Sequence, residues 1–317
     1  MKQPLAHRRL FIRDRSPRDL VSVLRNEDQV RQEKLVDLDG TIHKGLYEPR
    51  LRGFTSADVA LDLLNNWVMN YSFLRDNLRI FHKESGSLYE DIQGEERARC
   101  TRELVHMFAE VLINVDSSTL YCVMKDLPKR AFPRSKPVLQ MVGGRTTMIS
   151  CAMQMAVNSY GVHLNAERGL GNFLRYRGEG VSQGGKGIYG AEDKRLVAEA
   201  ACKDRDRAIV FGDTLEDLGL AYAARKLSPD SVVVAMHGRS EELEEYADIV
   251  ASSWEDLGMF MYTFMNDSSM PRVLHHSDEV EKVEPPRKII PRIQFALPPT
   301  KRVYSQHLYT ERPSLGI

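Results

Sequence analysis

The chain has 317 residues, of which 42% are hydrophobic, so it can bury a sizeable core as one large domain or two modest ones. Lysine plus arginine balance aspartate plus glutamate at 44 residues each, which argues against nucleic acid, an anionic membrane or a strongly acidic partner. The cysteines form no CxxC pair, and no apolar stretch is as long as that of a signal peptide or a membrane span. We therefore expect a cytoplasmic protein with reduced thiols.

The first expected elements are a surface arm and a buried strand. Residues 1–30 are rich in Arg, Asp and Gln and contain one short helical pattern, so we expect an N-terminal arm on the surface. Residues 34–41 read KLVDLDGT, an apolar run that leads into acid, glycine and a β-branched residue. This order is typical of a buried strand that ends at a site.

A helical insert is predicted over residues 49–133. Leu63, Trp67, Tyr71 and Leu74 recur at steps of three or four residues, and apolar residues over 104–112 repeat the pattern. We therefore expect a helical cap that interrupts a core built from residues 31–48 and 134–265.

Strands and helices alternate after the insert. A short helix over residues 138–142 is followed by a Gly-Gly break, and a strand over residues 146–149 then ends at Ser150, with a helix to about residue 160 after it. Further strands are predicted over residues 207–211 and 231–236. This alternation predicts an α/β fold with a doubly wound, Rossmann-like parallel sheet.

The end of the chain has a different composition. Residues 266–317 contain seven of the fourteen prolines and little apolar periodicity. We expect a Pro-rich C-terminal extension beyond the core.

Acidic residues follow two of the predicted strands. In a doubly wound sheet the carboxyl ends of the strands meet at one edge, which is where such folds bind ligands. Carboxylates this close repel one another unless a cation lies between them, and hard oxygen donors suit Mg²⁺. The residues expected at this edge are Asp37, Asp39, Ser150, Lys194, Asp213 and Asp217.

Two motifs resemble those of the haloacid dehalogenase-like (HAD) superfamily. Its first motif, an apolar strand followed by DxDGT, stands at residues 36–41 as VDLDGT, and its fourth, GDxxxD, stands at residues 212–217 as GDTLED. The two motifs occur in the family's order, on predicted strand ends. The resemblance covers residues 33–265 and is to the phosphoserine-phosphatase-like branch, which has a helical C1-type cap inserted after the first motif.

The resemblance implies a chemical role for the two aspartates of the first motif. Asp37 would attack phosphorus and form an aspartyl-phosphate, which water then hydrolyses. Asp39 would protonate the leaving oxygen and then activate water. The presence of Asp39 favours cleavage of phosphate esters over carbon–halogen chemistry.

The resemblance also implies a metal and a phosphate site. Mg²⁺ would be held by Asp37, the carbonyl of Asp39, Asp213 and Asp217. Thr41, Ser150 and Lys194 would bind the phosphate.

The second motif has an alternative position. The family often shows Ser-Gly-Gly, and Gly143 and Gly144 follow Val142 here. Ser150 is preferred, because a strand that ended at Val142 would supply no hydroxyl.

Other positions also have alternatives. Lys194 is preferred to Lys186 because it has the better spacing before the fourth motif. Glu216 could share the metal position with Asp217. His43 could contact substrate, although we expect it at the polar surface.

The sequence therefore predicts an Mg²⁺-dependent phosphatase that hydrolyses a small-molecule phosphate monoester, with neither nucleic acid nor a membrane as partner. A phosphotransferase that passes the aspartyl-phosphate to an alcohol is one alternative. A catalytically weak binding or scaffold protein with the same fold is another. The substrate and the oligomeric state do not follow from the sequence.

Overall fold

The computed structural model describes residues 10–43, 60, 94–112, 115–173, 175–177, 180–182, 187–237 and 240–266. Within these residues a seven-stranded sheet has the strand order β1-β9-β8-β7-β2-β3-β4. Its strands are β1 (Leu10–Ile12), β2 (Gln32–Val36), β3 (Arg145–Met153), β4 (Arg168–Asn172), β7 (Arg207–Gly212), β8 (Val232–Met236) and β9 (Ile249–Ala251). A separate antiparallel pair is formed by β5 (Arg175–Arg177) and β6 (Gly180–Ser182).

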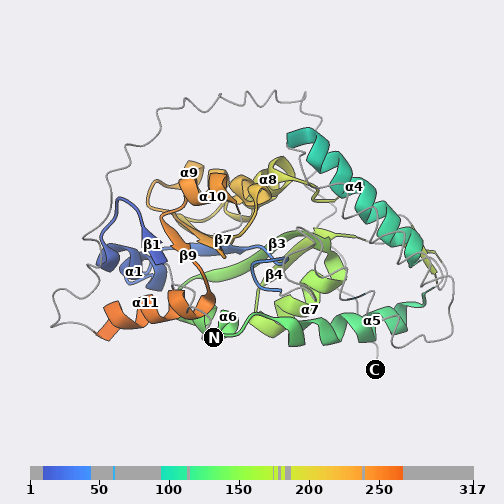
Figure 1. Ribbon diagram of the computed structural model, residues 1–317, viewed down its shortest axis with the longest axis horizontal. Helices are drawn as coiled ribbons and strands as arrows, with labels where there is room; N and C mark the ends of the chain where they lie inside the picture. The colour runs from blue at the N-terminus through green and yellow to red at the C-terminus, as the bar shows by residue number, and fades with distance from the viewer. Residues whose placement is uncertain are drawn as a thin grey trace, which may run out of the picture. The chain divides into compact units, whose positions relative to one another are not determined.

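Helices lie on both faces of the sheet (Figure 1). One layer contains α8 (Ala191–Ala201), α9 (Leu218–Leu227) and α10 (Glu241–Tyr246). The other contains α1 (Pro17–Arg25), α6 (Ser135–Met141), α7 (Gln154–Leu164) and α11 (Trp254–Asn266). Two further helices, α4 (Gly94–Val111) and α5 (Ser117–Asp126), come from the expected cap segment and are followed by the 3-10 helix η1 (Leu127–Arg130).

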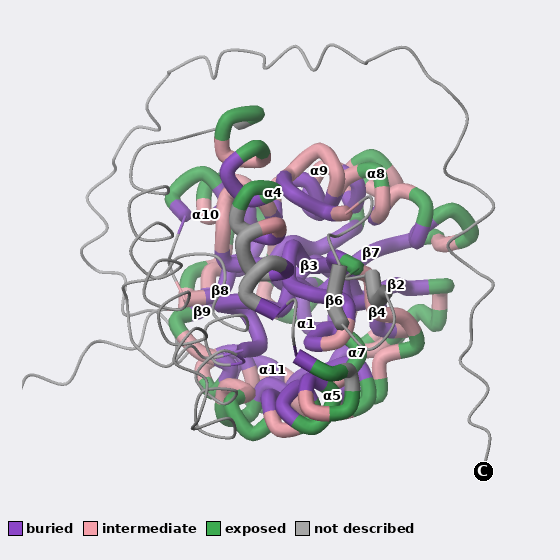
Figure 2. Tube along the Cα trace, turned by 90° about the vertical axis from the view of Figure 1, so that its right-hand side faces the viewer, coloured by how far each residue is buried: buried purple, intermediate pink, exposed green. Residues whose placement is uncertain are grey.

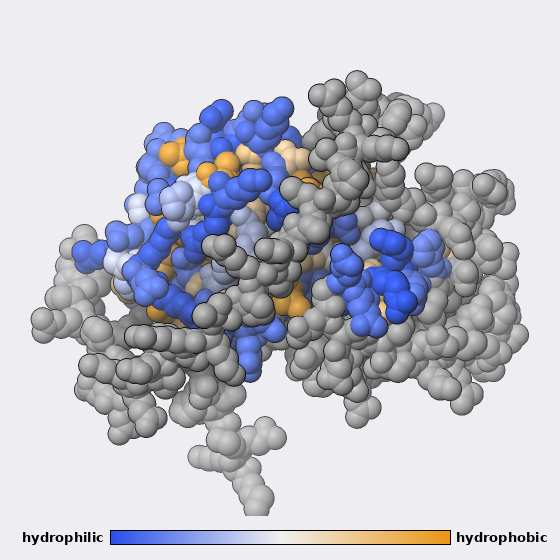
Figure 3. All heavy atoms as spheres, turned by 90° about the horizontal axis from the view of Figure 1, so that it is seen from above, coloured by the Kyte–Doolittle hydropathy of each residue, from blue (hydrophilic) through white to orange (hydrophobic). Residues whose placement is uncertain are grey.

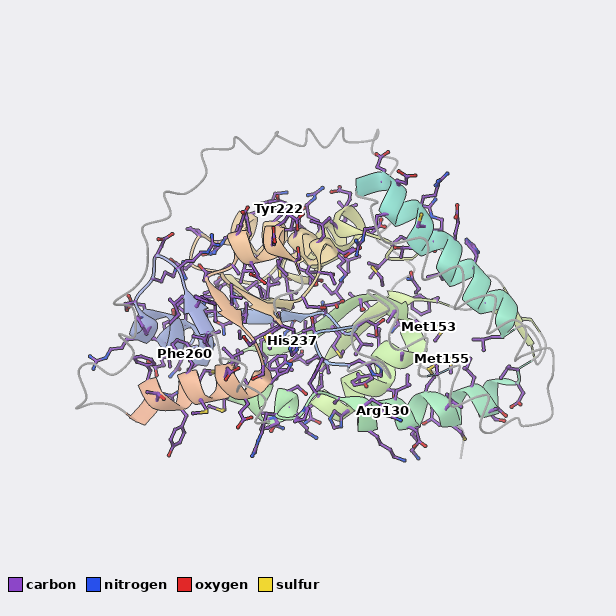
Figure 4. The ribbon with its side chains drawn as sticks, viewed as in Figure 1. Arg130, Met153, Met155, Tyr222, His237 and Phe260 are labelled. Atoms are coloured by element: carbon purple, nitrogen blue, oxygen red, sulfur yellow. The ribbon has the colours of Figure 1, made fainter. Side chains whose placement is uncertain are left out.

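The sheet separates two apolar clusters. Leu35 of β2 packs with the α8, α9 and α10 layer, whereas Val36 packs with the opposite layer. Successive side chains of a strand point to opposite faces, which accounts for this division. Figure 4 shows the same arrangement, with Tyr222 of α9 on one side of the sheet and Phe260 of α11 on the other.

The central strands are buried on both faces. Every residue of β2, β7 and β8 is buried, as expected of parallel strands covered by helices. Figure 2 shows these strands in the interior, with exposed residues on the outer faces of the helices. In Figure 3, the described surface above α8 and α9 is mostly hydrophilic, with small hydrophobic patches. The structure therefore has the predicted doubly wound α/β sheet.

Residues 10–25 differ from the surface arm that we expected. β1 pairs antiparallel with β9 at the edge of the sheet, and Leu20 and Leu24 of α1 are fully buried. Ser16 caps α1 by accepting a hydrogen bond from the amide of Asp19. The short apolar stripe of α1 is enough to join this segment to the core.

β3 is longer than predicted. It continues through Ser150 to Met153, and α7 begins only at Gln154. Its pairing with β4 shifts register between Ile149 and Met153, near the carboxyl end of the strand. Met153 lies at the junction of β3 and α7 (Figure 4).

The expected cap is described in part. α5 packs on α7, and Leu120, Val123 and Met124 of α5 belong to the same apolar cluster as Tyr160. The predicted helical residues over 63–74 lie outside the described part of the chain. Among the described helices, none is long and apolar enough to cross a membrane.

Candidate active site

The strand ends that carry the two acidic motifs are neighbours. β2 lies between β7 and β3, with Val36 paired to Phe211 on one side and to Met148 on the other. The amide of Asp37 donates to the carbonyl of Phe211 at 3.0 Å. Asp37 and Asp213 therefore come out at the same edge, as their motifs predicted.

Three buried aspartates meet at this edge. Carboxylate oxygens of Asp37, Asp213 and Asp217 lie within 4.8 Å of one another. Lys194 of α8 donates from Nζ to Asp37 Oδ1 at 2.7 Å and to Asp217 Oδ1 at 2.6 Å. One ammonium does not balance the charge of three carboxylates, and uncompensated buried charge is costly. A divalent cation that prefers hard oxygen ligands therefore fits this cluster in the described structure.

Asp217 holds the loop after β7 in place. Its Oδ2 accepts hydrogen bonds from the amides of Asp213 and Thr214, at 2.9 and 3.0 Å, and from the Thr214 hydroxyl at 3.2 Å. A Cβ at Gly212 would lie 2.4 Å from the Cβ of Asp217, so the motif needs glycine there. Asp217 thus orders the loop and Lys194 at the same time.

The loop after β2 is a tight turn. The carbonyl of Leu38 accepts from the amides of Ile42 and His43, at 2.9 and 2.8 Å, and Gly40 has φ of +89°. Glycine adopts this left-handed conformation without a steric penalty. The turn brings Asp39 and Thr41, both buried, beside the acidic cluster.

Thr41 makes a different contact from the one we expected. Its hydroxyl donates to Asp213 Oδ1 at 2.7 Å. A threonine hydroxyl has one proton to donate, so in this arrangement it orients Asp213 rather than a phosphate oxygen. This pairing could not be predicted from local sequence patterns, because the two residues are 172 positions apart.

Ser150 is buried in the carboxyl half of β3, next to β2. Its Oγ accepts weakly from the amide of Ala152 at 3.3 Å, so the hydroxyl proton can point elsewhere. It is not the N-cap of α7, which is Met153. Burial raises the pKa of the adjacent Cys151 thiol well above its ordinary value.

The alternative position for the second motif lies elsewhere. Val142 is the C-cap of α6, and its carbonyl accepts a hydrogen bond from Lys34 Nζ at 2.9 Å. Gly144 then leads into the amino end of β3, which begins at Arg145. Val142 is therefore at the opposite edge of the sheet from the acidic cluster. Lys186, the alternative to Lys194, lies outside the described residues.

The pKa values of Asp37 and Lys194 are both raised, but burial acts on them in opposite directions. Burial and, to a smaller extent, the charge of Asp217 raise the pKa of Asp37 to about 7, with Lys194 opposing both effects. Burial alone would lower the pKa of Lys194, but the charges of Asp217 and Asp37 outweigh it and hold the pKa well above its ordinary value. Lys194 therefore stays charged, and an added cation would favour ionised Asp37.

His43 is fully buried, contrary to the expected surface position. Its Nδ1 bonds to the hydroxyl of Tyr160, which donates its own proton to the carbonyl of Leu127 at 2.6 Å. Nδ1 is therefore the donor to Tyr160. Burial and the charge of Asp39 raise the pKa of Tyr160 above its ordinary value, so the phenol stays neutral.

Glu216, the alternative metal ligand, faces a partner from the cap segment. Arg97 of α4 bonds to both of its carboxylate oxygens. The motif spacing that favours Asp217 over Glu216 agrees with this arrangement, because the Asp217 carboxylate is the one in the acidic cluster.

The sequence matches no model of a protein family, and no curated protein resembles it closely enough to count as a match. Solved structures do match. Cytosolic 5′-nucleotidase IIIB, bound to cytidine, has a TM-score of 0.55 at 17% identity, covering 81% of this chain and 94% of that one. A protein of unknown function from Bordetella pertussis has a TM-score of 0.51 at 12% identity, covering 68% and 94%.

A probable phosphoserine phosphatase from Vibrio cholerae has a TM-score of 0.48 at 12% identity, covering 74% of this chain and 66% of that one. The likeness to the nucleotidase extends over most of both chains. This chain thus has the HAD-like fold, as its two acidic motifs predicted.

Proposed function

We propose that this chain is an Mg²⁺-dependent phosphatase that hydrolyses a small-molecule phosphate monoester through an aspartyl-phosphate on Asp37. The observation that carries the proposal is the cluster of Asp37, Asp213 and Asp217, with Lys194 bonded to Asp37 and Asp217, at the carboxyl ends of neighbouring parallel strands. Ligands of doubly wound folds bind at this edge.

The metal would be held by Asp37, the Asp39 carbonyl and Asp213, with Asp217 beside them. These are the hard oxygen ligands that Mg²⁺ prefers. When bound, the ion supplies positive charge that neutralises the carboxylates and the phosphoryl oxygens.

Asp37 is the nucleophile of the proposed reaction. A carboxylate oxygen of Asp37 forms a bond to phosphorus while the ester P–O bond breaks, and Asp39 gives its proton to the leaving oxygen. Asp39 then takes a proton from water, which attacks phosphorus, breaks the Asp37–phosphate bond and releases inorganic phosphate. Both aspartates return to their starting states.

Lys194 and Ser150 are proposed to bind the phosphoryl oxygens. The ammonium of Lys194 has three N–H donors, of which two go to Asp37 and Asp217 among the described contacts. The third can reach a phosphoryl oxygen, and the hydroxyl of Ser150 can donate to another. In this proposal Thr41 acts through Asp213.

The test is a phosphate-release screen with the full chain and Mg²⁺. The panel contains sugar, amino-acid and lipid-headgroup esters, together with pyrimidine nucleoside monophosphates, because the matched nucleotidase was solved with cytidine. Asp37→Asn should abolish turnover and keep the wild-type melting temperature. Fluoroberyllate with Mg²⁺, a mimic of the aspartyl-phosphate, should bind the wild type and not this variant.

Three outcomes would overturn the proposal. Retained turnover in Asp37→Asn would exclude the aspartyl-phosphate. Transfer of phosphate to added alcohols in preference to water would make the chain a phosphotransferase, and a vanishing rate across the panel would favour a binding or scaffold role.

A further inference from the structure

Helix α4 contacts the loop that carries the fourth motif. Arg97 donates from Nε to Glu216 Oε1 and from Nη2 to Oε2, the second at 3.3 Å. The side chains of Arg97 and Glu216 are 15% and 12% exposed, so water screens this ion pair less than a pair on the surface. Glu216 directly precedes Asp217 in η2 (Leu215–Asp217).

α4 also packs against the start of α8. The guanidinium of Arg102 lies 5.1 Å from the centre of the Tyr189 ring. A Cβ at Gly190 would lie 3.1 Å from the Cβ of Ala98, so the two helices approach closely at this point. The amide of Lys194 bonds to the carbonyl of Gly190, one turn earlier. α4 therefore contacts the loop that carries Glu216 and the start of α8, the two segments that meet at Asp217.

The loop around Glu216 is held by hydrogen bonds to the adjacent residue, Asp217. Asp217 binds the amides of Asp213 and Thr214 and the ammonium of Lys194. A bidentate arginine–carboxylate pair fixes orientation as well as charge, so Arg97 restrains this loop from outside. Lysine would not replace it, because an ammonium lacks the planar fork.

We propose that Arg97 is a positioning residue for the metal site, acting through Glu216 on the loop that carries Asp213 and Asp217. This inference rests on the proposed function. Because α4 lies in the segment expected to form the cap, the contact links that segment to metal binding.

The charge of Arg97 and its positioning role predict opposite effects on the metal. If only charge mattered, loss of this cation near an acidic cluster would strengthen Mg²⁺ binding, and loss of the Glu216 charge would weaken it. If positioning matters, loss of either partner weakens binding. The sign of the change in Arg97→Met therefore separates the two roles.

The experiment measures Mg²⁺ binding by isothermal titration calorimetry, which needs no turnover. Arg97→Met and Glu216→Gln should each weaken Mg²⁺ binding on the order of 10-fold, as other residues that orient metal ligands do. The double variant should be no weaker than the worse single variant, because both remove one contact. The charge-swapped pair Arg97→Glu with Glu216→Arg should recover part of the loss.

Arg99 supplies the matched control on the same helix. Its side chain is 65% exposed and its carboxylate partners are 3.7 and 3.9 Å away. Arg99→Met should bind Mg²⁺ as the wild type does. Arg97→Lys keeps the charge and the aliphatic stem, so it serves if Arg97→Met does not fold, and it should also bind more weakly than the wild type.

The outcomes distinguish this inference from the proposed function. If the wild-type protein binds no Mg²⁺, both the proposed function and the positioning role of Arg97 are wrong. Wild-type binding together with unchanged or tighter binding in folded Arg97→Met or Arg97→Lys would overturn the positioning role alone.

Discussion

Trp254 donates its indole N–H to the carbonyl oxygen of Thr41 at 2.8 Å. The same threonine donates its hydroxyl to Asp213, and the Trp254 ring packs on Phe211, with ring centres 5.4 Å apart. Helix α11 thus holds the loop after β2 from within the core. Thr41 therefore links helix α11 to Asp213 of the fourth motif.

Replacement of Thr41 by valine should weaken the metal site. The substitution keeps the shape of the side chain and removes the donor that orients Asp213 Oδ1. We expect Mg²⁺ affinity to fall on the order of 10-fold, by calorimetry. Thr41→Ser keeps the hydroxyl and should stay close to the wild type. Equal affinity in the valine variant would show that this hydrogen bond does not orient Asp213.

The acidic cluster could be predicted from the sequence because its residues follow strands with clear patterns. Asp37 and Asp213 each come directly after a buried strand with an apolar run near its carboxyl end, and parallel strands bring their carboxyl ends to one edge. Lys194 could be predicted from its spacing before the strand that leads to Asp213. The fold class and the core of the site were therefore accessible from local patterns.

Contacts between distant segments were not accessible in the same way. His43 and Tyr160 are 117 positions apart, and neither lies in a pattern that points to the other. β1 and β9 have three residues each, which is too short for alternation to show. The polar residues around α1 hid its buried stripe, and for this reason residues 10–25 were expected at the surface.

Leu24 tests whether α1 belongs to the core. It is fully buried, so Leu24→Ala should lower the free energy of unfolding by about 2–5 kcal/mol through lost burial and a residual cavity. Val162, which is 81% exposed, is the control, and Val162→Ala should change stability little. Urea denaturation measures both. Similar small effects in the two variants would mean that α1 is not packed in solution.

The titration of Lys34 should make the free energy of unfolding depend on pH in the alkaline range. Burial lowers its pKa to about 8, although the charge of Glu33 opposes the shift. Its pKa in the unfolded chain is about 10.4, so between these values the unfolded state binds more protons. The stability of the wild type relative to Lys34→Met should therefore rise as pH increases from about 8 to 10.4.

Urea denaturation of both proteins over this pH range measures the difference, in which the titration of other groups cancels. At alkaline pH Lys34→Met should be less stable than the wild type, because the carbonyls of Leu139 and Val142 lose their donor. A stability difference that does not change with pH would mean that Lys34 titrates alike in the folded and unfolded states.

Lys194 should matter for folding as well as for turnover. Its removal leaves Asp37 and Asp217 buried without the ammonium that both accept from. Loss of one partner from a buried ion pair costs about 3–5 kcal/mol, because the remaining charge is uncompensated. Lys194→Met, which keeps most of the side-chain volume, should therefore be destabilised by about this amount without metal.

Mg²⁺ distinguishes a loss of charge balance from a loss of packing. A cation at the cluster replaces part of the missing charge, so saturating Mg²⁺ should stabilise Lys194→Met more than the wild type, while turnover stays lost. Lys226, which is 68% exposed and pairs with Glu199 at the surface, is the control, and Lys226→Met should respond to Mg²⁺ as the wild type does. Thermal unfolding with and without Mg²⁺ measures both. If Lys194→Met is as stable as the wild type without metal, the buried carboxylates do not depend on this lysine and the arrangement of the site must differ.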